Sequence, residues 1–184
     1  MISETGVWSD EEQHAHIFSY NVARFIAKLL KPYRDDPYQL YDIGCGNGTY
    51  TEYFNELGLL TLGFDGYVSN TNSSFITQID LTKEFKIDIP ENILCLEVWE
   101  HIPAEYEDIF VDNLVNNLKG YLILSVAVEG QEGLGHVNCR SNQYVIDKLQ
   151  SKGLIYNEHL TKQIREMPEN YVAYFRETLM IFEK

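Results

Sequence analysis

The sequence has few basic residues. It contains 14 Lys and Arg against 28 Asp and Glu, which gives a formal net charge of −14 at pH 7. Proteins that bind long nucleic acids neutralise phosphates with Lys and Arg, usually in clusters. Because the basic residues here are few and dispersed, we expect no long RNA or DNA partner. The acidic residues are densest from Asp80 to Asp112, where we interpret them as a solvated helix surface.

Cysteine is also scarce, and long apolar runs are lacking. The three cysteines, Cys45, Cys95 and Cys139, are scattered and odd in number, so we expect reduced thiols and a cytoplasmic location. No string with metal-ligand spacing is visible, and we predict no metal. The longest clear apolar run, Tyr121 to Val128, is too short to cross a bilayer. The N-terminus lacks the basic start and apolar stretch of a signal peptide. We therefore expect no association with a membrane.

The sequence does contain enough apolar residues for a sizeable core. Hydrophobic residues make up 45% of the 184 residues, and there are 13 tyrosines. A chain of this length suits one domain, and it shows no internal repeat, low-complexity tract or linker. We expect a single domain over residues 1–184, in which an N-terminal helical lid (1–38) precedes a core (39–184).

The most informative stretch runs from Gln39 to Gly58. A short apolar run, Leu40 to Ile43, ends in three alternating glycines, Gly44, Gly46 and Gly48, and a helix-compatible segment follows. A strand, a tight glycine turn and a helix open the nucleotide-binding α/β folds. Glycine permits unusual φ values and lets a ligand approach the backbone, and the free amides at the helix start can meet an electron-rich group.

The spacing of these glycines indicates which ligand the turn would hold. Dinucleotide folds use G-x-G-x-x-G, whereas here the pattern is G-x-G-x-G, with Asp42 two residues before the first glycine. The string D-I-G-C-G-N-G, from Asp42 to Gly48, resembles motif I of the class I S-adenosylmethionine-dependent methyltransferases. The resemblance implies that this loop, with Cys45 in it, holds the methionine portion of S-adenosylmethionine and that Asp42 helps to orient the amino group. A glycine turn with no ligand is the alternative.

Two further acids fit the same ligand. Asp65 and Gly66 follow an expected strand, Leu59 to Phe64, about twenty residues past the glycine loop, where this architecture places a carboxylate on a ribose. Asp-Gly is also a good turn pair, and both roles can hold at once. The resemblance implies that Asp80 and the backbone of Leu81 meet the adenine, although Asp80 could equally cap the turn that follows it.

A second motif lies at the end of an expected strand from Asn92 to Val98. The string E-V-W-E-H-I-P, from Glu97 to Pro103, is similar to the motif after strand four in many small-molecule O-, N- and C-methyltransferases. The resemblance implies that Glu97 lies near the methyl donor and that His101 lies near the transferred methyl group. Trp99 stands where those sequences usually have Leu, so we expect it at the pocket wall or stacked on the substrate.

A glycine-rich loop from Val128 to Arg140 follows an expected strand, Gly120 to Ala127. Loops at the C-terminal edge of open α/β sheets build substrate sites. His136, Asn138 and Arg140 could face a polar ligand, or they could be incidental polar residues of a mobile loop. The segment G-H-V-N resembles one in small stand-alone methyltransferases associated with glycan decoration.

The remaining segments complete the expected fold. An amphipathic helix from Asp10 to Lys31, which the resemblance makes a lid of the donor pocket, carries His14 and His16, and we expect both at the surface or its boundary. The other expected elements are helices at 104–119 and from Ser141 to Lys152, and strands at 75–79, 154–160 and 178–182. The expected fold is a Rossmann-like α/β fold with a seven-stranded, mostly parallel sheet, an antiparallel last strand and helices on both faces.

Together these features predict methyl transfer from S-adenosylmethionine to a hydroxyl of a sugar, a glycan or another small polar acceptor. An alcohol must lose its proton in the transition state, and the reference pKa of histidine suits that task at neutral pH. We predict His101 as the general base, with His136 assisting or substituting. The alternatives are N- or O-methylation of a small metabolite or a protein side chain, and a non-catalytic subunit that binds S-adenosylmethionine beside a partner.

Overall fold

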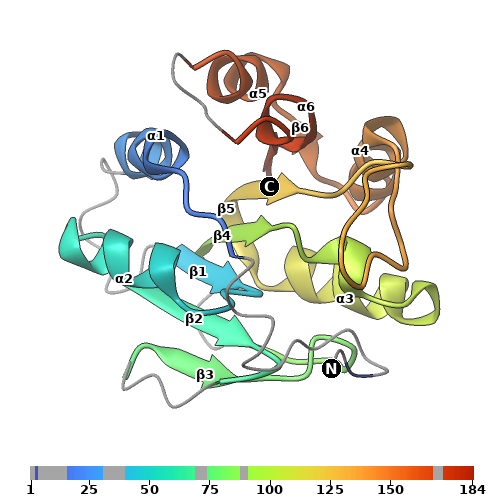
Figure 1. Cartoon of the computed structure of the whole chain (residues 1–184), viewed down its shortest axis with the longest axis horizontal. Helices are drawn as coiled ribbons and strands as arrows, with labels where there is room; N and C mark the ends of the chain where they lie inside the picture. The colour runs from blue at the N-terminus through green and yellow to red at the C-terminus, as the bar shows by residue number, and fades with distance from the viewer. Residues whose placement is uncertain (1–2, 4–15, 31–39, 69–73, 88–90, 168–171) are drawn as a thin grey trace.

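One sheet organises the molecule. The computed structural model describes Ser3 and residues 16–30, 40–68, 74–87, 91–167 and 172–184. The strands of this described part are β1 (Leu40–Ile43), β2 (Thr61–Asp65), β3 (Ile76–Gln78), β4 (Glu91–Leu96), β5 (Leu118–Ser125), β6 (Ile155–Tyr156) and β7 (Met180–Glu183). They form a seven-stranded sheet in the order β3-β2-β1-β4-β5-β7-β6 (Figure 1). β7 is antiparallel to both of its neighbours, and the other pairs are parallel, which confirms the predicted sheet.

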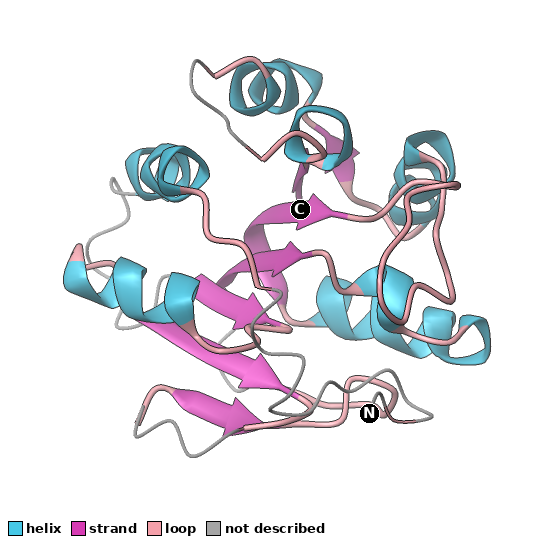
Figure 2. Ribbon diagram, in the orientation of Figure 1, coloured by secondary structure: helices cyan, strands magenta, loops and turns pink. Residues whose placement is uncertain are grey.

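Helices flank this sheet (Figure 2). The α-helices are α1 (Tyr20–Leu30), α2 (Thr49–Glu56), α3 (Glu107–Asn116), α4 (Asn142–Ser151), α5 (Glu158–Arg165) and α6 (Phe175–Thr178), and the short 3₁₀ helices η2 (Trp99–His101) and η3 (Ala104–Tyr106) precede α3. One apolar cluster joins the sheet to α3 and α4, and a second joins it to α1, α2, α5 and α6. The predicted layers are therefore confirmed. Within the described residues, no helix combines the length and the apolarity that a bilayer span requires.

The central strands are buried on both faces. In β5, Leu122 and Leu124 belong to the cluster under α3 and α4, while Ile123 between them belongs to the opposite cluster. Successive strand side chains point to opposite faces, so a strand covered on both sides must be apolar at almost every position. The unbroken apolar runs that predicted buried strands arise from this arrangement.

The N-terminal helix is shorter than predicted. Residues 16–19 are not helical, and α1 begins at Tyr20 instead of Asp10; residues 10–15 and 31 lie outside the described residues. Ser19 caps the helix, because its hydroxyl accepts a hydrogen bond from the Val22 N–H at 3.4 Å and its carbonyl accepts one from the Ala23 N–H at 3.0 Å. A serine at such a position satisfies N–H groups that have no partner within the helix.

Two boundaries near other elements also differ from the prediction. Only Ile155–Tyr156 of the predicted strand at 154–160 is a strand, because Asn157 caps a helix, α5, by accepting a hydrogen bond from the Leu160 N–H at 2.8 Å. The helix predicted at 104–119 ends at Asn116, and β5 already begins at Leu118. The predicted cap of α4 is confirmed, since the Ser141 hydroxyl accepts from the Tyr144 N–H.

Candidate functional site

A cavity of about 380 Å³ opens at the carboxyl ends of β1, β2 and β4. In open α/β sheets, ligands bind at this edge. Its walls come from residues 16–18, Asp42 and the glycine loop, the start of α2, residues 65 and 66, Leu81, residues 96–98, 101 and 102, residues 131–134 and 136, and residues 174 and 175. The structure thus brings both sequence motifs and the second glycine-rich loop to one cavity.

The glycine loop is bound tightly to its neighbours. The N–H groups of Gly44 and Cys45 both donate to the carbonyl of Phe64, at 2.7 and 3.1 Å. Gly44 has a φ of 75°, and a Cβ there would come within 2.3 Å of Val98 Cγ2. Both the left-handed backbone and the lack of space therefore require glycine. Gly44 and Cys45 line the cavity, and burial raises the pKa of the Cys45 thiol.

Gly46 and Gly48 have different roles in this loop. Gly46 lines the cavity at a φ of 54°, and a Cβ there would come within 2.2 Å of His16 Cε1. Gly48 does not line the cavity; it is the N-cap of α2, at a φ of 79°. The loop therefore offers bare backbone to the cavity at Gly46, while Gly48 only turns the chain into the helix.

Asp42 lies at the floor of the cavity, near the end of β1. Its side chain is buried, and its Oδ2 accepts a hydrogen bond from the hydroxyl of Thr51 at 2.8 Å. Burial raises the pKa of Asp42 to about 7, although the Thr51 hydrogen bond works in the opposite direction. A cationic group of a ligand would favour the ionised form of this carboxyl.

Asp65 joins β2 to the glycine loop. Its Oδ2 accepts a hydrogen bond from the Gly46 N–H at 2.8 Å, and its Oδ1 accepts one from the Tyr67 N–H at 3.0 Å. Each carboxylate oxygen can accept a second hydrogen bond, so Asp65 keeps acceptor capacity for hydroxyls in the cavity. Both Asp65 and Gly66 line the cavity. Burial raises the pKa of Asp65, against the effect of these two N–H donors.

The structure separates the two residues predicted to meet an adenine. Leu81 lines the cavity, whereas Asp80 does not. The Asp80 carboxylate accepts hydrogen bonds from the Thr82 N–H at 3.0 Å and the Thr82 hydroxyl at 2.6 Å, and it pairs with Lys83 at 2.9 Å. These contacts correspond to the turn-capping alternative, and the adenine contact of Asp80 stays a prediction.

Glu97 has an unusual backbone. Its φ is 53°, and among the described residues it is the one non-glycine residue with positive φ. Its N–H donates to the Ser125 hydroxyl at 2.9 Å, and its Oε2 accepts from Gln131 Nε2 at 3.0 Å. Positive φ is costly for a residue with a Cβ and is concentrated at functional sites. Glu97 lines the cavity, and its place near the methyl donor stays a prediction.

His101 and His136 meet at the wall of the cavity. Their ring centroids are 5.0 Å apart at an interplanar angle of 74°. His101 Nδ1 lies 3.1 Å from the carbonyl oxygen of Gly135, and His136 Nδ1 lies 3.1 Å from that of Gln131. A carbonyl can only accept, so each Nδ1 carries the proton in the neutral ring and the lone pair lies on Nε2. Burial, with the nearby His136, lowers the pKa of His101 to about 4.

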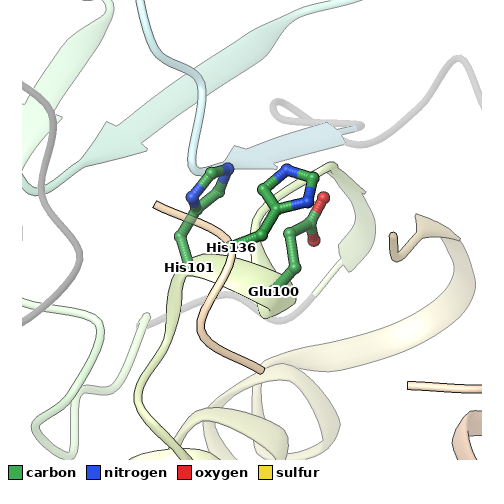
Figure 3. Close-up of side chains that lie close together, drawn as sticks. All are labelled: Glu100, His101 and His136. Atoms are coloured by element: carbon green, nitrogen blue, oxygen red, sulfur yellow. The ribbon is translucent and has the colours of Figure 1, made fainter. Parts of the chain in front are cut away.

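Glu100 lies behind these two histidines. Its side chain is 0% exposed, and neither carboxyl oxygen has a hydrogen-bond partner in the described part of the chain. Burial and the charge of Glu97 raise its pKa well above the usual range. Its backbone carbonyl accepts from the N–H groups of Val137 and Asn138, at 2.8 and 3.0 Å. Figure 3 shows the ring of His136 between His101 and the carboxyl of Glu100.

The three residues predicted to bind substrate do not line the cavity. Trp99 Nε1, Asn138 Nδ2 and Arg140 Nε instead donate to Oε2 of Glu107, at 3.1, 2.9 and 2.9 Å. The Tyr144 hydroxyl donates to the other oxygen, Oε1, at 2.5 Å. Buried polar groups must find partners, and here one buried carboxylate satisfies them. In this structure these three side chains are directed to Glu107 and not to the cavity, and their contact with a substrate stays a prediction.

Some cavity residues were not predicted as site residues. His16, Ile17 and Phe18 form one wall, although they precede α1, and no residue of α1 itself lines the cavity. Within the described residues, this part of the wall comes from the non-helical segment before α1, and the predicted lid over residues 1–38 stays a prediction. Tyr174 and Phe175, near the C-terminus, form another part of the wall. No local motif marks these positions, because they reach the cavity only through the folding of distant segments.

The fold is shared with solved methyltransferases. A sugar N-methyltransferase, KedS8, from Streptoalloteichus sp ATCC 53650 superposes with a TM-score of 0.68 at 12% identity, over 100% of this chain and 98% of that one. A TehB-like methyltransferase from Corynebacterium glutamicum gives 0.63 at 16% identity, over 95% and 92%. The 1,6-didemethyltoxoflavin-N1-methyltransferase of Burkholderia thailandensis, solved with S-adenosylhomocysteine, gives 0.59 at 14% identity, over 89% and 78%. At such identities the likeness establishes the fold alone.

The sequence itself carries the family assignment. No curated protein sequence matches this chain. The sequence profile of a family of methyltransferase domains, however, matches residues 13–168, which is most of the chain and includes the glycine loop, the E-V-W-E-H-I-P segment and the loop that carries His136. This chain therefore belongs to the methyltransferase-domain family.

Proposed function

We propose that this methyltransferase takes its methyl group from S-adenosylmethionine and transfers it to a hydroxyl of a sugar, a glycan or another small polar acceptor. The observation that carries the proposal is that one cavity joins the glycine loop and Asp65 to His101 and His136. Donor-binding and reactive groups must meet in one enclosed space for a transfer between two bound molecules.

The chain's residues fit the donor. Gly46 presents backbone without a side chain, Asp65 has acceptor capacity for ribose hydroxyls, and Asp42 and Glu97 add acidic groups to the same walls. S-adenosylmethionine supplies an electrophilic methyl group on a positively charged sulfur. Acidic walls suit a ligand with a sulfonium and an amino group, because opposite charges attract strongly where water is partly excluded.

The chain's contribution to the chemistry is first alignment and then removal of a proton. Alignment in a fixed site can lower a bimolecular barrier by roughly 7–11 kcal/mol. We assign the proton of the acceptor hydroxyl to His101, with His136 assisting. The hydrogen bond from His101 Nδ1 to Gly135 leaves the lone pair on Nε2. The lowered pKa of His101 keeps the ring neutral at pH 7, but it also makes the ring a weaker base than a free imidazole. Such proton transfer contributes on the order of 10²- to 10⁴-fold.

The acceptor class is proposed from charge and from the G-H-V-N resemblance. With a net charge of −14, the chain is poorly suited to long nucleic acids. Nitrogen is a second candidate for the acceptor atom, since the neighbours KedS8 and the toxoflavin enzyme are N-methyltransferases by name. Methylation of a small metabolite or a protein side chain is a further candidate reaction. Donor binding without catalysis, beside a partner, is a candidate function of a different class.

Radiolabelled S-adenosylmethionine, incubated with panels of sugars, amino sugars, peptides and RNA, tests the proposal. We expect label on the hydroxylated sugars and none on RNA. Label on amino sugars alone would move the acceptor to nitrogen. Donor binding with no transfer to any acceptor would favour the non-catalytic function and contradict the proposal. His159→Gln, on the exposed surface of α5, is a control that should leave transfer unchanged.

A further inference from the structure

We propose that Glu100, His101 and His136 bind a divalent transition-metal cation at the wall of the cavity. One ligand atom from each residue lies within 4.8 Å of the other two. Ligands at about 2.0–2.2 Å from a shared cation stand some 3–4.4 Å from one another, so small rotations of the side chains are sufficient. Glu100 and His101 come from η2, and His136 comes from the loop after β5 (Figure 3).

The carboxyl of Glu100 is the first observation that points to a cation. It is completely buried, and no hydrogen-bond partner for either oxygen is present among the described residues. An unpartnered buried polar group is costly, and native proteins satisfy nearly all of them. The group lies beside the ring of His136 (Figure 3). A cation between the carboxyl and the imidazoles would supply the partner that it lacks.

The orientation of both imidazoles is a second, independent observation. His101 Nδ1 and His136 Nδ1 each lie 3.1 Å from a backbone carbonyl oxygen, of Gly135 and Gln131 respectively. Metal-binding histidines almost always donate their other ring N–H to a carbonyl, a carboxylate or water, which fixes the tautomer and orients the ligand nitrogen. Each ring thus has one nitrogen held by a backbone carbonyl.

The backbone holds the two parts of the cluster together. The carbonyl of Glu100 accepts from the N–H groups of Val137 and Asn138, so the residue that supplies the carboxyl also anchors the loop of His136. Gly133 provides space for the ring, because a Cβ there would come within 2.1 Å of His136 Nε2. The ligands are thus positioned in advance, as a selective metal site requires.

The ligand types indicate which cation the cluster binds. Two imidazoles and one carboxylate suit Mn²⁺, Fe²⁺, Co²⁺ or Zn²⁺, whereas Mg²⁺ and Ca²⁺ prefer sites made of oxygen. Three protein ligands leave coordination positions open. His101 and His136 line the cavity and Glu100 does not, so the open positions face the space where an acceptor would lie.

The sequence predicted no metal, because the ligands form no recognisable string. Two of them are adjacent, and the third comes from a loop far along the chain. The spacing of the ligands in the sequence therefore does not predict the site. The loop of His136 is held beside Glu100 by the hydrogen bonds from the N–H groups of Val137 and Asn138 to the Glu100 carbonyl. The predicted absence of a metal is replaced by this proposal.

A bound cation would change the role of His101. This consequence, unlike cation binding itself, rests on the proposed function. With the cation present, His101 is a ligand and not the proton acceptor. A hydroxyl of the acceptor at an open position would have a lowered pKa. Its O–H bond would break with the proton passing to water, while its oxygen forms a bond to the methyl carbon and the bond between that carbon and the sulfur of S-adenosylmethionine breaks. The lowered pKa of the acceptor hydroxyl then makes an imidazole base unnecessary.

Titration of the metal-free full-length protein with Mn²⁺, followed by the loss of the free Mn²⁺ signal in electron paramagnetic resonance, tests the site. We expect one Mn²⁺ per chain, with at least a tenfold loss of affinity, about 1.4 kcal/mol, in Glu100→Gln and in His136→Gln. Zn²⁺ should displace the Mn²⁺ and Mg²⁺ should not. His159→Gln, which removes a histidine on the exposed surface of α5, should bind as the wild type does.

Two comparisons exclude misfolding as the cause of weaker binding. Glu100→Gln removes a buried acid that has no partner among the described residues, so without metal it should unfold at the same or a higher temperature than the wild type. Mn²⁺ should raise the unfolding temperature of the wild type but not that of Glu100→Gln. Gly133→Ala keeps all three ligands but crowds the His136 ring, and it should also weaken binding. Equal Mn²⁺ affinity in the wild type, Glu100→Gln and His136→Gln would overturn the site.

Separate measurements distinguish a failure of the metal site from a failure of the proposed function. Binding of S-adenosylhomocysteine, measured by calorimetry on the same metal-free protein, reports the donor pocket without the cation. Mn²⁺ binding that depends on Glu100 supports the metal site even if no acceptor is methylated. Methyl transfer that survives EDTA unchanged would overturn the catalytic role of the cation, and loss of transfer in EDTA with recovery in Mn²⁺ would support it.

Discussion

The carboxylate of Asp65 accepts a hydrogen bond from the backbone N–H of Gly46 at 2.8 Å. This contact joins the end of β2 to the glycine loop after β1, so the residue proposed to bind a ribose also fixes the loop proposed to bind the methionine portion. The Asp65 carboxyl group thus has two roles, the hydrogen bond to the glycine loop and the proposed contact with the ribose. Substitutions can test these two roles separately.

Replacing Asp65 with Asn should weaken donor binding more than it disturbs the fold. The amide oxygen can still accept from the Gly46 N–H, but the amide nitrogen cannot accept from the Tyr67 N–H, and the charged acceptor for hydroxyls is lost. Hydrogen bonds to charged groups contribute about 1.5–3 kcal/mol, so we expect a loss of S-adenosylhomocysteine affinity of at least about tenfold in calorimetry. Asp147→Asn, on the exposed surface of α4, is the matched control. Equal affinities in the two variants would contradict the role of Asp65.

A methyl group at Gly46 should block the donor pocket. Gly46→Ala would place a Cβ within 2.2 Å of His16 Cε1, at a φ of 54°. Gly58 also has positive φ, at 77°, but a Cβ there would contact nothing within 4 Å. Gly58→Ala therefore reports the backbone strain alone, which is about 1 kcal/mol. We expect both variants to lose stability in urea unfolding, and Gly46→Ala alone to lose affinity for S-adenosylhomocysteine.

If Gly58→Ala lost the same affinity, general destabilisation would explain both results. The double variant Gly46→Ala with His16→Ala separates the two causes in the loop itself. Removing the imidazole relieves the contact but leaves the strained backbone. We expect the double variant to recover part of the affinity for S-adenosylhomocysteine, because the contact with the imidazole is removed and only the backbone strain remains.

Replacing Glu107 should destabilise the whole molecule. Its carboxylate, 5% exposed, accepts from Trp99, Asn138, Arg140 and Tyr144. Glu107→Ala leaves Trp99 and Asn138 unpaired in a buried site, whereas Arg140 and Tyr144 are partly exposed and can turn to water. An unsatisfied buried polar group costs about 1–3 kcal/mol. We expect a loss of that size in urea unfolding. Glu105→Gln, in the exposed part of η3, is the control and should change stability by less than about 0.5 kcal/mol.

The contribution of Glu107 should also depend on pH. Burial acts to raise its pKa, but the hydrogen bonds from Tyr144, Asn138, Trp99 and Arg140 outweigh burial, and the pKa is lowered. For a carboxyl with a lowered pKa, the stabilisation is present above the unfolded pKa and is lost as the pH falls through the folded pKa. The stability difference between the wild type and Glu107→Gln should therefore shrink below about pH 4. A constant difference down to the acid transition would contradict this.

Asp42 should show the opposite pH dependence. Burial raises its pKa to about 7, so the folded state binds a proton more tightly than the unfolded state. Ionising Asp42 therefore destabilises the donor-free protein progressively from the unfolded pKa up to the folded one. Asp42→Asn keeps the acceptor for Thr51 without the charge. Its stability advantage in urea unfolding should grow by about 2–3 kcal/mol between pH 5 and pH 8. An advantage that is the same at both pH values would contradict the raised pKa.

The strands and the donor side of the cavity could be predicted because their signals are local. The glycine loop must turn sharply beside β1, so its requirement for glycine appears in consecutive residues. Asp65 follows the next strand at the same sheet edge, which topology places beside that loop. His101 follows β4 in the same way, and the cavity contains all three parts.

The rest of the site depends on contacts between distant segments. Asn138 and Arg140 are polar residues in a glycine-rich loop, which suggested a substrate, but Glu107 on α3 satisfies them. Nothing near either residue in the sequence identifies that partner. Glu100 lies inside a recognisable motif but has no role that the sequence reveals, because only the structure shows that its carboxyl is buried, faces His136 and has no partner among the described residues.

Calorimetric titration of the purified chain with S-adenosylhomocysteine, and separately with NAD, tests the central claim most directly. The account predicts saturable binding of S-adenosylhomocysteine that Gly46→Ala abolishes, and no heat with NAD. Tight binding of NAD without any response to S-adenosylhomocysteine would contradict it.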